Sequence, residues 1–238
     1  MQDRKEPLLL FDMDGTLINQ KDTPSYSGTK THHSSYMSIK RQMKEIVIQH
    51  GVPKEKVVHL DRMALIWNQT RRILEERGKE ENEIISLIEK INVPFMVEER
   101  ADHSKSVLLP ETIPTLKELT QNGYNLGLVT TASRESYEKL SKDVKFGKFG
   151  SYFRKSITRD DCKYIKPDPE PIERMLSLYK TSNFIYIGDS DHDGQAAKTA
   201  GGKFILINTR NYDEKTIISI DPDHVIDKLS ELPYLLEP

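Results

Sequence analysis

Three features that would indicate a particular class of protein are scarce or missing in this chain. Its only cysteine, Cys162, excludes an internal disulfide framework in 238 residues. Its apolar runs, such as Leu8–Phe11, are far shorter than the roughly 20 residues that span a bilayer. Excess charge of one sign is also missing, because 35 Lys and Arg face 37 Asp and Glu. A net charge of −2 provides no basic field for nucleic acid, so we expect neither nucleic acid nor a membrane as partner.

The composition is that of a folded protein, with 36% hydrophobic and 30% charged residues. The first residues, Met-Gln-Asp-Arg-Lys-Glu-Pro, carry charge but no apolar segment behind it. This start does not resemble a secretory signal, and we therefore expect a cytoplasmic protein. The length suits one large domain or two small ones.

The hydrophobic pattern alternates between short apolar runs and helical periodicity. Runs of four apolar or small residues at 8–11, 126–129, 184–187 and 204–207 are typical of parallel strands buried on both faces. Helical spacing indicates helices near 37–50, 65–74, 80–91, 116–119, 170–179 and 196–201. The fold class expected is α/β, a Rossmann-like parallel-sheet core with an inserted α-helical domain.

The predicted domain boundaries lie where the hydrophobic pattern of the sequence changes. Residues 1–19 and 108–238 form the α/β core, and residues 20–107 form the helical insert. The polar stretch 20–34 reads as a loop, with Pro24 and Gly28. It contains His32 and His33, but no third ligand stands nearby at zinc spacing, so we expect no zinc site there.

Aspartate or threonine residues directly follow three of the predicted strands or their last glycine. Asp12 and Asp14 follow the first strand, two residues apart, so that both carboxylates point to the same side. Thr130 and Thr131 follow the second, and a segment that begins at Asp189 follows the third. Ligands of open α/β sheets bind beyond the carboxyl ends of the strands. These residues therefore predict a functional site.

The predicted chemistry follows from the crowding of carboxylates. Carboxylates that repel one another raise each other's pKa unless a hard cation is present, and a set of oxygen ligands suits Mg²⁺. One aspartate at such a site can attack phosphorus, while a second protonates the leaving oxygen. Lys166, in a loop before a helix, is the candidate to balance the charge of the phosphoryl oxygens.

Four segments together resemble a known family. They are D-x-D-G-T after the first strand, a threonine that ends the second, the Lys-Pro-Asp-Pro segment at 166–169, and G-D-S-x-x-D at 188–193 with A-A-x-x-A-G behind it. In this order they resemble the haloacid dehalogenase (HAD) superfamily of phosphohydrolases, over about residues 7–19 and 108–236. The insert is similar to the helical cap of the phosphoglycolate phosphatase and β-phosphoglucomutase branch, which closes over the site.

The resemblance implies roles for four aspartates. Asp12 is expected to be the nucleophile and a Mg²⁺ ligand. Asp14 is expected to be the general acid and base, and also to bind the metal through its backbone carbonyl. Asp189 is the third expected metal ligand. Asp193 is expected to orient Lys166 or a metal-bound water.

The resemblance also implies how the phosphoryl group is held. Thr130 is expected to donate a hydrogen bond to it, helped by the amide of Thr131, and Lys166 is expected to hold nucleophile and phosphate together. One departure from the pattern follows the threonines. Many relatives carry Asn-Lys, whereas this chain reads Thr131-Ala132-Ser133-Arg134, and Arg134 is the candidate replacement for that lysine.

Other conspicuous residues have plainer interpretations. Asp191 and His192 read as loop residues near the site with no chemical role. Trp67 reads as part of the core of the insert. Three arginines of the insert are candidates to meet an anionic substrate, although on helices of this composition most such residues face water: Arg71, Arg72 and Arg100.

The sequence therefore predicts an enzyme, a Mg²⁺-dependent phosphatase that hydrolyses a small phosphorylated metabolite, phosphoglycolate or a sugar phosphate, through an aspartyl-phosphate. One alternative is a phosphomutase of the β-phosphoglucomutase type. Another is a non-catalytic phosphate-binding scaffold. Dehalogenation is disfavoured because it leaves Asp14 without a use. The choice of substrate and the oligomeric state stay open.

Overall fold

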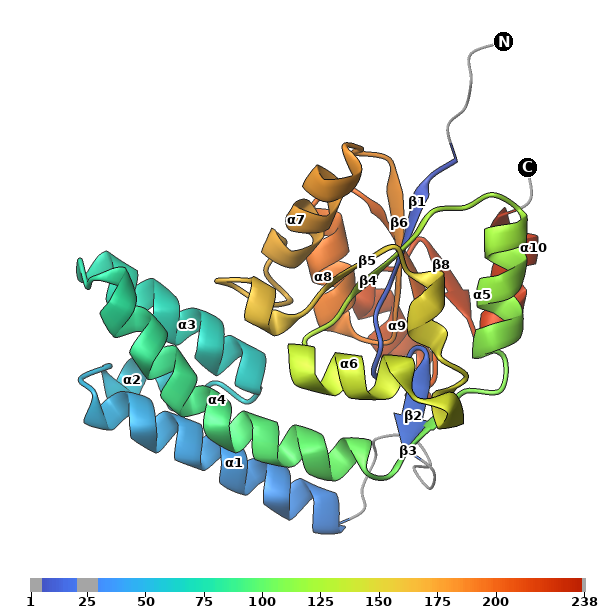
Figure 1. Ribbon diagram of the computed structural model, residues 1–238. Coiled ribbons are helices and arrows are strands. Elements are labelled where there is room, and N and C mark those ends of the chain that lie inside the picture. The colour runs from blue at the N-terminus through green and yellow to red at the C-terminus, as the bar shows by residue number, and fades with distance from the viewer. Residues whose placement is uncertain (1–5, 21–29, 237–238) are drawn as a thin grey trace.

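The computed structural model describes residues 6–20 and 30–236 and consists of two units (Figure 1). The larger unit is built on a six-stranded sheet in which every pair of neighbouring strands is parallel. The strand order is β5-β4-β1-β6-β7-β8. The strands are β1 (Leu8–Phe11), β4 (Leu126–Val129), β5 (Lys155–Ile157), β6 (Phe184–Gly188), β7 (Lys203–Ile207) and β8 (His224–Ile226).

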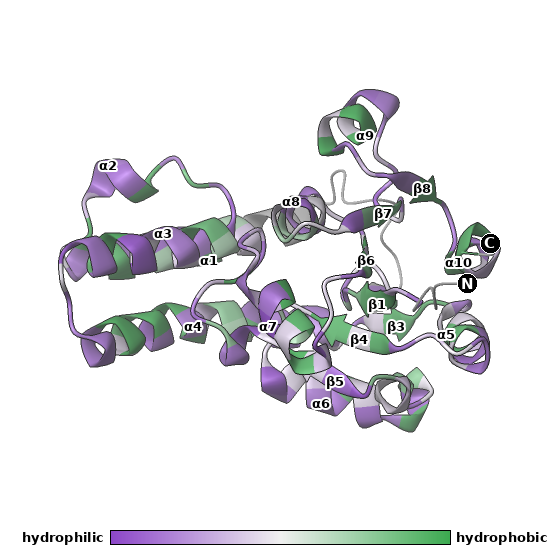
Figure 2. Ribbon diagram, turned by 90° about the horizontal axis from the view of Figure 1, so that it is seen from above, coloured by the Kyte–Doolittle hydropathy of each residue, from purple (hydrophilic) through white to green (hydrophobic). Residues whose placement is uncertain are grey.

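Strand β1 supplies both faces of the sheet with buried side chains, as its unbroken apolar run predicts. Leu9 and Phe11 belong to a cluster with α5 (Thr112–Gln121), α6 (Arg134–Lys142) and α10 (Leu232–Leu236). Leu8 and Leu10 belong to a cluster with α7 (Glu170–Tyr179) and α8 (Asp191–Thr199). The short α9 (Glu214–Ile220) lies beside α8. Helices thus cover both faces, and Figure 2 shows β1 and β4 as hydrophobic ribbons between them. The predicted fold class is confirmed.

The second unit is helical and has its own hydrophobic core. It comprises α1 (Lys30–Gln49), α2 (Lys54–Val57), α3 (Met63–Glu76) and α4 (Glu81–His103). Its buried side chains, including Met43, Ile66, Trp67 and Ile91, form a cluster separate from those of the sheet. The antiparallel pair β2 (Ile18–Gln20) and β3 (Ser106–Leu108) connects the helices to the sheet. We call residues 30–103 the helical unit.

The structure corrects three details of the sequence prediction. Helix α1 begins at Lys30, so His32 and His33 lie in a helix rather than a loop, and Pro24 and Gly28 lie outside the described residues. Helix α4 continues through Pro94 to His103. Asp191 and His192 open helix α8, whose N-cap Ser190 accepts a hydrogen bond from the amide of Asp193. Burial of Pro94, Glu98 and Glu99 accounts for the extension of α4, and the cap at Ser190 accounts for the start of α8.

Further elements escaped the sequence prediction altogether. The short strands β5 and β8 form the two edges of the sheet, where their few residues give no clear apolar run. Helices α2, α6, α9 and α10 and the strands β2 and β3 were also missed. No helix in the described part of the chain combines the length and the apolarity needed to cross a membrane.

The central strand predicts a test of stability. Leu10 is fully buried, whereas Leu178 on α7 is 48% exposed. Truncation to alanine at a buried site leaves a cavity, so Leu10→Ala should lower the free energy of unfolding by about 2–5 kcal/mol. Leu178→Ala, the same change on the surface, should alter it by less than about 0.5 kcal/mol. Urea denaturation of both variants measures the difference, and equal losses would contradict the packing described.

Candidate active site

The carboxyl ends of the strands meet a cleft beneath the helical unit. After β1 the chain builds β4 and β5 on one side of it and then β6, β7 and β8 on the other, so β1 lies at the switch point of the sheet. The cleft has a volume of about 800 Å³ and is lined by both units. Every site residue that the sequence predicts lines it: Asp12, Asp14, Thr130, Thr131, Lys166, Asp189 and Asp193.

A buried ammonium group links two of the aspartates. Lys166 Nζ donates hydrogen bonds to Asp12 Oδ1 at 2.8 Å and to Asp193 Oδ1 at 2.6 Å. It also donates to Tyr186 Oη at 2.7 Å and to the carbonyl oxygen of Val129 at 3.2 Å. The three charged side chains are all buried. Such groups are stable in the interior only when they are paired and hydrogen-bonded, as they are here.

Burial and mutual charge set the protonation of this cluster. Burial favours neutral lysine, but Asp12 and Asp193 outweigh it and raise the pKa of Lys166 well above its ordinary value. Burial also opposes the charge of Asp193, yet Lys166 and the hydroxyl of Ser190 hold its pKa below the ordinary value. The pKa of Asp12 is raised, because burial and the neighbouring carboxylates outweigh Lys166. The charge of Lys166 thus offsets only part of the effect that burial and the neighbouring carboxylates have on the pKa of Asp12.

The residues present fit a divalent cation. Oxygen atoms of Asp12, Asp189 and Asp193 lie within 4.8 Å of one another. Asp189 is buried, and its Oδ1 has no hydrogen-bond partner among the described residues. Its Oδ2 accepts from Arg210 Nε at 2.5 Å. An all-oxygen cluster with an orphaned buried carboxylate oxygen is the donor set that a hard cation prefers.

Gly15 explains part of the D-x-D-G-T pattern. Its φ is +83°, a backbone conformation that favours glycine. A Cβ at this position would overlap the carboxylate of Asp189. The glycine therefore allows the turn after β1 to approach the carboxylate that follows β6.

The second aspartate of the pattern stands apart from the buried cluster. The side chain of Asp14 is 47% exposed, and its Oδ1 accepts a hydrogen bond from His103 Nε2 at 2.8 Å. His103 is the last residue of α4, in the helical unit. Burial lowers the pKa of His103, but the contact with Asp14 outweighs burial and raises it. Asp14 is thus open to the cleft and held by the helical unit.

The threonines after β4 lie in a turn that the helical unit also contacts. The hydroxyl oxygen of Thr130 accepts a hydrogen bond from the amide of Ala132 at 3.0 Å. The carbonyl of Thr131 accepts one from the buried guanidinium of Arg159. Arg159 forms an ion pair with Glu99 of α4, and Glu99 in turn accepts from Ser133. This turn is therefore fixed from both units.

The remaining candidate residues form contacts outside the cleft. Arg134 binds Ser156 and Asp161 and does not line the cleft, so it does not replace the family lysine there. Arg71, Arg72 and Arg100 of the helical unit do not line the cleft either. They form ion pairs instead: Arg71 with Glu75 and Glu81, Arg72 with Asp168, and Arg100 with Glu135. Arg71 is buried, contrary to the expectation that it faces water.

Comparisons with known proteins agree with this geometry. Residues 9–207 match the model of the family described as haloacid dehalogenase-like hydrolase. The chain belongs to this family. It is 30% identical to the pyrophosphatase PpaX of Bacillus velezensis over 240 residues, which cover 99% of this chain and 98% of that protein. The predicted family, its branch and the enzyme class of an HAD-type hydrolase are confirmed.

Solved structures share the fold over nearly the whole chain. A predicted phosphoglycolate phosphatase from Haemophilus somnus has a TM-score of 0.59 at 19% identity and covers 98% of each chain. An HAD phosphatase from Thermococcus onnurineus has a TM-score of 0.55 at 24% identity and covers 97% of each chain.

Three residues of this HAD hydrolase site escaped the sequence analysis. Tyr186 lies within the apolar run of β6, where an aromatic residue reads as core. His103 lies more than 80 residues from Asp14, and nothing in the sequence relates the two. Arg210 follows β7 at the carboxyl edge of the sheet. The strand-end rule that found Asp12 and Asp189 applies to Arg210 as well.

His192 provides a test of the electrostatics around the cleft. Burial and the charge of Arg62 lower its pKa to about 4, from an ordinary value of 6.5. Between these values the unfolded chain binds a proton that the native protein does not, so stability should fall as the pH falls. The loss is up to about 1.4 kcal/mol per pH unit. Urea denaturation at pH 6 and pH 5 should show a smaller loss for His192→Gln than for the wild type, and identical losses would refute the shift.

Proposed function

We propose that the protein is a Mg²⁺-dependent phosphatase that hydrolyses a small phosphorylated metabolite through an aspartyl-phosphate on Asp12. The observation that carries the proposal is the buried arrangement of Asp12, Lys166 and Asp193 at the switch point of the sheet, with Asp14 open to the same cleft. Membership of the HAD hydrolases and relatives named as phosphatases support it.

The nucleophile is held in place before the substrate arrives. Lys166 binds one carboxylate oxygen of Asp12, which leaves the other oxygen to attack phosphorus. As the P–O bond to the leaving group breaks, Asp14 donates a proton to the departing oxygen. Asp14 then takes a proton from the water that cleaves the aspartyl-phosphate, so that both residues return to their starting state.

The charge of the phosphoryl group needs several cationic or polar partners. Lys166 and the backbone and hydroxyl groups after β4, at Thr130 and Thr131, are the proposed partners on the protein. Asp12, Asp189 and the backbone carbonyl of Asp14 would hold Mg²⁺, with Asp193 orienting Lys166. When bound, the cation supplies positive charge that keeps Asp12 ionised and offsets the phosphoryl oxygens.

The helical unit is proposed to act as a cap, with residues 20–107 as the inserted domain and residues 1–19 and 108–238 as the core. It covers the cleft and contributes lining residues from α1, α3, α4 and the N-cap of α3, including Tyr36, Lys40, Arg62 and Phe95. A cover of this kind excludes water and favours a small substrate. The place of action proposed remains the cytoplasm.

Three substrate classes follow from the sequence and the relatives. Phosphoglycolate and a sugar phosphate are the expectations from the resemblance. Inorganic pyrophosphate is added because the relative with 30% identity is named a pyrophosphatase. A phosphomutase would instead form glucose 6-phosphate from β-glucose 1-phosphate without matching release of phosphate.

The nucleophile predicts a matched pair of variants. Asp12→Asn removes the attacking oxygen and should lower phosphate release from the best of these substrates by at least about 1,000-fold. Asp191→Asn makes the same chemical change on a residue that pairs with Arg62 and carries no proposed role, and it should stay within a few-fold of the wild type. Removal of Mg²⁺ with EDTA should abolish release, and its return should restore it. Full activity of Asp12→Asn would rule out the proposed mechanism.

The two roles of Asp14 predict a burst. p-Nitrophenolate leaves without a proton, so Asp14→Asn should still form the aspartyl-phosphate from p-nitrophenyl phosphate. Hydrolysis of that intermediate needs a base, which the variant lacks, and it should slow by about 100-fold or more. Stopped-flow absorbance should therefore record about one equivalent of p-nitrophenolate per enzyme followed by a slow phase. Steady turnover at the wild-type rate with no burst would exclude Asp14 as the base.

A further inference from the structure

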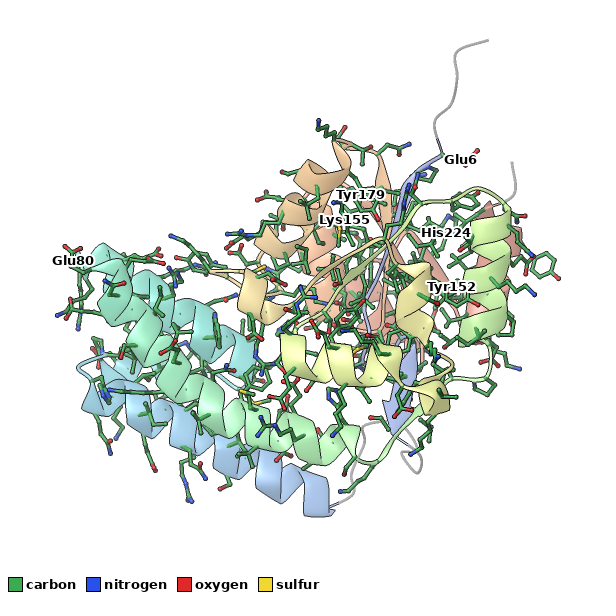
Figure 3. All side chains as sticks on the ribbon, in the orientation of Figure 1. Glu6, Glu80, Tyr152, Lys155, Tyr179 and His224 are labelled. Carbon is green, nitrogen blue, oxygen red and sulfur yellow. The ribbon has the colours of Figure 1, made fainter. Side chains whose placement is uncertain are left out.

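The loop that carries Lys166 is held by the helical unit as well as by the sheet. This loop, residues 163–168, is here called the lysine loop. It lies between β5 and α7 in the sheet-containing unit, and α3 of the helical unit lies against it. Figure 1 shows this part of the chain reaching from the sheet toward α3. In Figure 3 the labelled Glu80 lies at the end of the helical unit that is remote from the sheet, and its neighbour Glu81 forms an ion pair with Lys163 of the lysine loop.

The centre of the contact is one buried amide. Asn68 on α3 is 3% exposed. Its Nδ2 donates to the carbonyl oxygen of Ile165 at 2.6 Å, and its Oδ1 accepts from the amide of Ile165 at 2.9 Å. The side chain thus satisfies both backbone groups of the residue directly before Lys166. The carbonyl oxygen of Ile165 also accepts from the amide of Asp168 at 3.0 Å, so without Asn68 it is the amide of Ile165 that loses its partner, at a cost of about 1–3 kcal/mol.

Packing reinforces the pairing. The side chain of Ile165 is 1% exposed and belongs to the hydrophobic cluster of the helical unit, not to either cluster of the sheet. Trp67, beside Asn68 on α3, donates from Nε1 to the carbonyl oxygen of Lys163 at 3.1 Å. The lysine loop therefore packs into the helical unit with one residue while the next points into the active site.

We propose that Asn68 is a positioning residue that couples the helical unit to Lys166. Its amide fixes the backbone of Ile165, and this fixes the origin of the side chain whose ammonium group bridges Asp12 and Asp193. The lysine is then correctly placed only while α3 is docked on the lysine loop. The inference rests on the proposed phosphatase function, in which Lys166 stabilises the reacting phosphoryl group.

The first test is a pair of near-isosteric variants on α3. Asn68→Leu removes both hydrogen bonds, and kcat should fall by about 100-fold, as expected for a displaced catalytic group. KM should change much less than kcat, because the charge of Lys166 matters most as the phosphoryl group reacts and the other substrate contacts are unchanged. Thr70→Val is the control, since Thr70 is equally buried on α3 but its hydroxyl has no partner among the described residues. The control should keep wild-type kcat, and melting temperatures should confirm that both variants fold.

A second variant gives a readout that a merely structural role would not move. In Asn68→Asp the carboxylate still accepts from the amide of Ile165 but repels its carbonyl. A buried carboxyl group has a raised pKa, and once protonated it donates to that carbonyl as the amide does. The ratio of kcat in Asn68→Asp to kcat in the wild type should therefore rise at least about tenfold as the pH falls through the titration of the new carboxyl group.

The dependence on Lys166 completes the test. In a Lys166→Met background, Asn68→Leu should change kcat by less than about twofold, because residues that act through one another are not additive. An undiminished loss in that background would overturn the proposal, as would wild-type kcat in Asn68→Leu. Asp12→Asn is assayed in parallel. If turnover depends on Asp12 but does not change in Asn68→Leu, this inference alone is rejected. A wild type without turnover rejects the proposed function and this inference with it.

Discussion

The site is organised around one buried positive charge. An ammonium group in the protein interior is tolerated only if carboxylates and hydrogen-bond acceptors surround it, and Lys166 has Asp12, Asp193, Tyr186 and the carbonyl of Val129. These partners come from or directly follow β1, β4, β6 and α8, so the lysine can be satisfied only when those elements have assembled. The same charge is what a reacting phosphoryl group needs. Folding and the proposed catalysis therefore both require this buried charge.

The carboxylates around the lysine outnumber it. Asp12, Asp189 and Asp193 share a buried volume with Lys166 and, at its edge, Arg210. The raised pKa of Asp12 follows from burial and from this imbalance, whereas Asp193, bonded to both Lys166 and Ser190, keeps a low pKa. A carboxyl group with a raised pKa is ionised to a smaller extent at a given pH, and only the ionised form attacks phosphorus. A divalent cation corrects this deficit, which is a physical reason for the metal dependence proposed for this site.

The sequence predicted the residues whose position follows from the strands. Asp12, Thr130 and Asp189 each stand one residue after a buried apolar run or its glycine, and parallel strands bring those ends together. Asn68, His103 and Tyr186 could not be found in this way. Asn68 reads as one polar residue on an amphipathic helix, and its partner lies 97 residues away in the chain. Its role depends on how the two units dock, and no local pattern records that arrangement.

Docking of the helical unit involves several of the segments proposed to be catalytic. His103 reaches Asp14, Glu99 reaches Arg159 and the turn after Thr130, and Asn68 reaches the lysine loop. Movement of the helical unit away from the sheet must therefore break these contacts or carry the segments along. The contact at Asn68 combines two hydrogen bonds with the burial of Ile165, so separation there exposes both backbone groups and an apolar side chain. In the proposed mechanism, a cleft that opens by this route loses the correct position of Lys166 until it closes again, which confines phosphoryl transfer to the closed state, where bulk water is excluded.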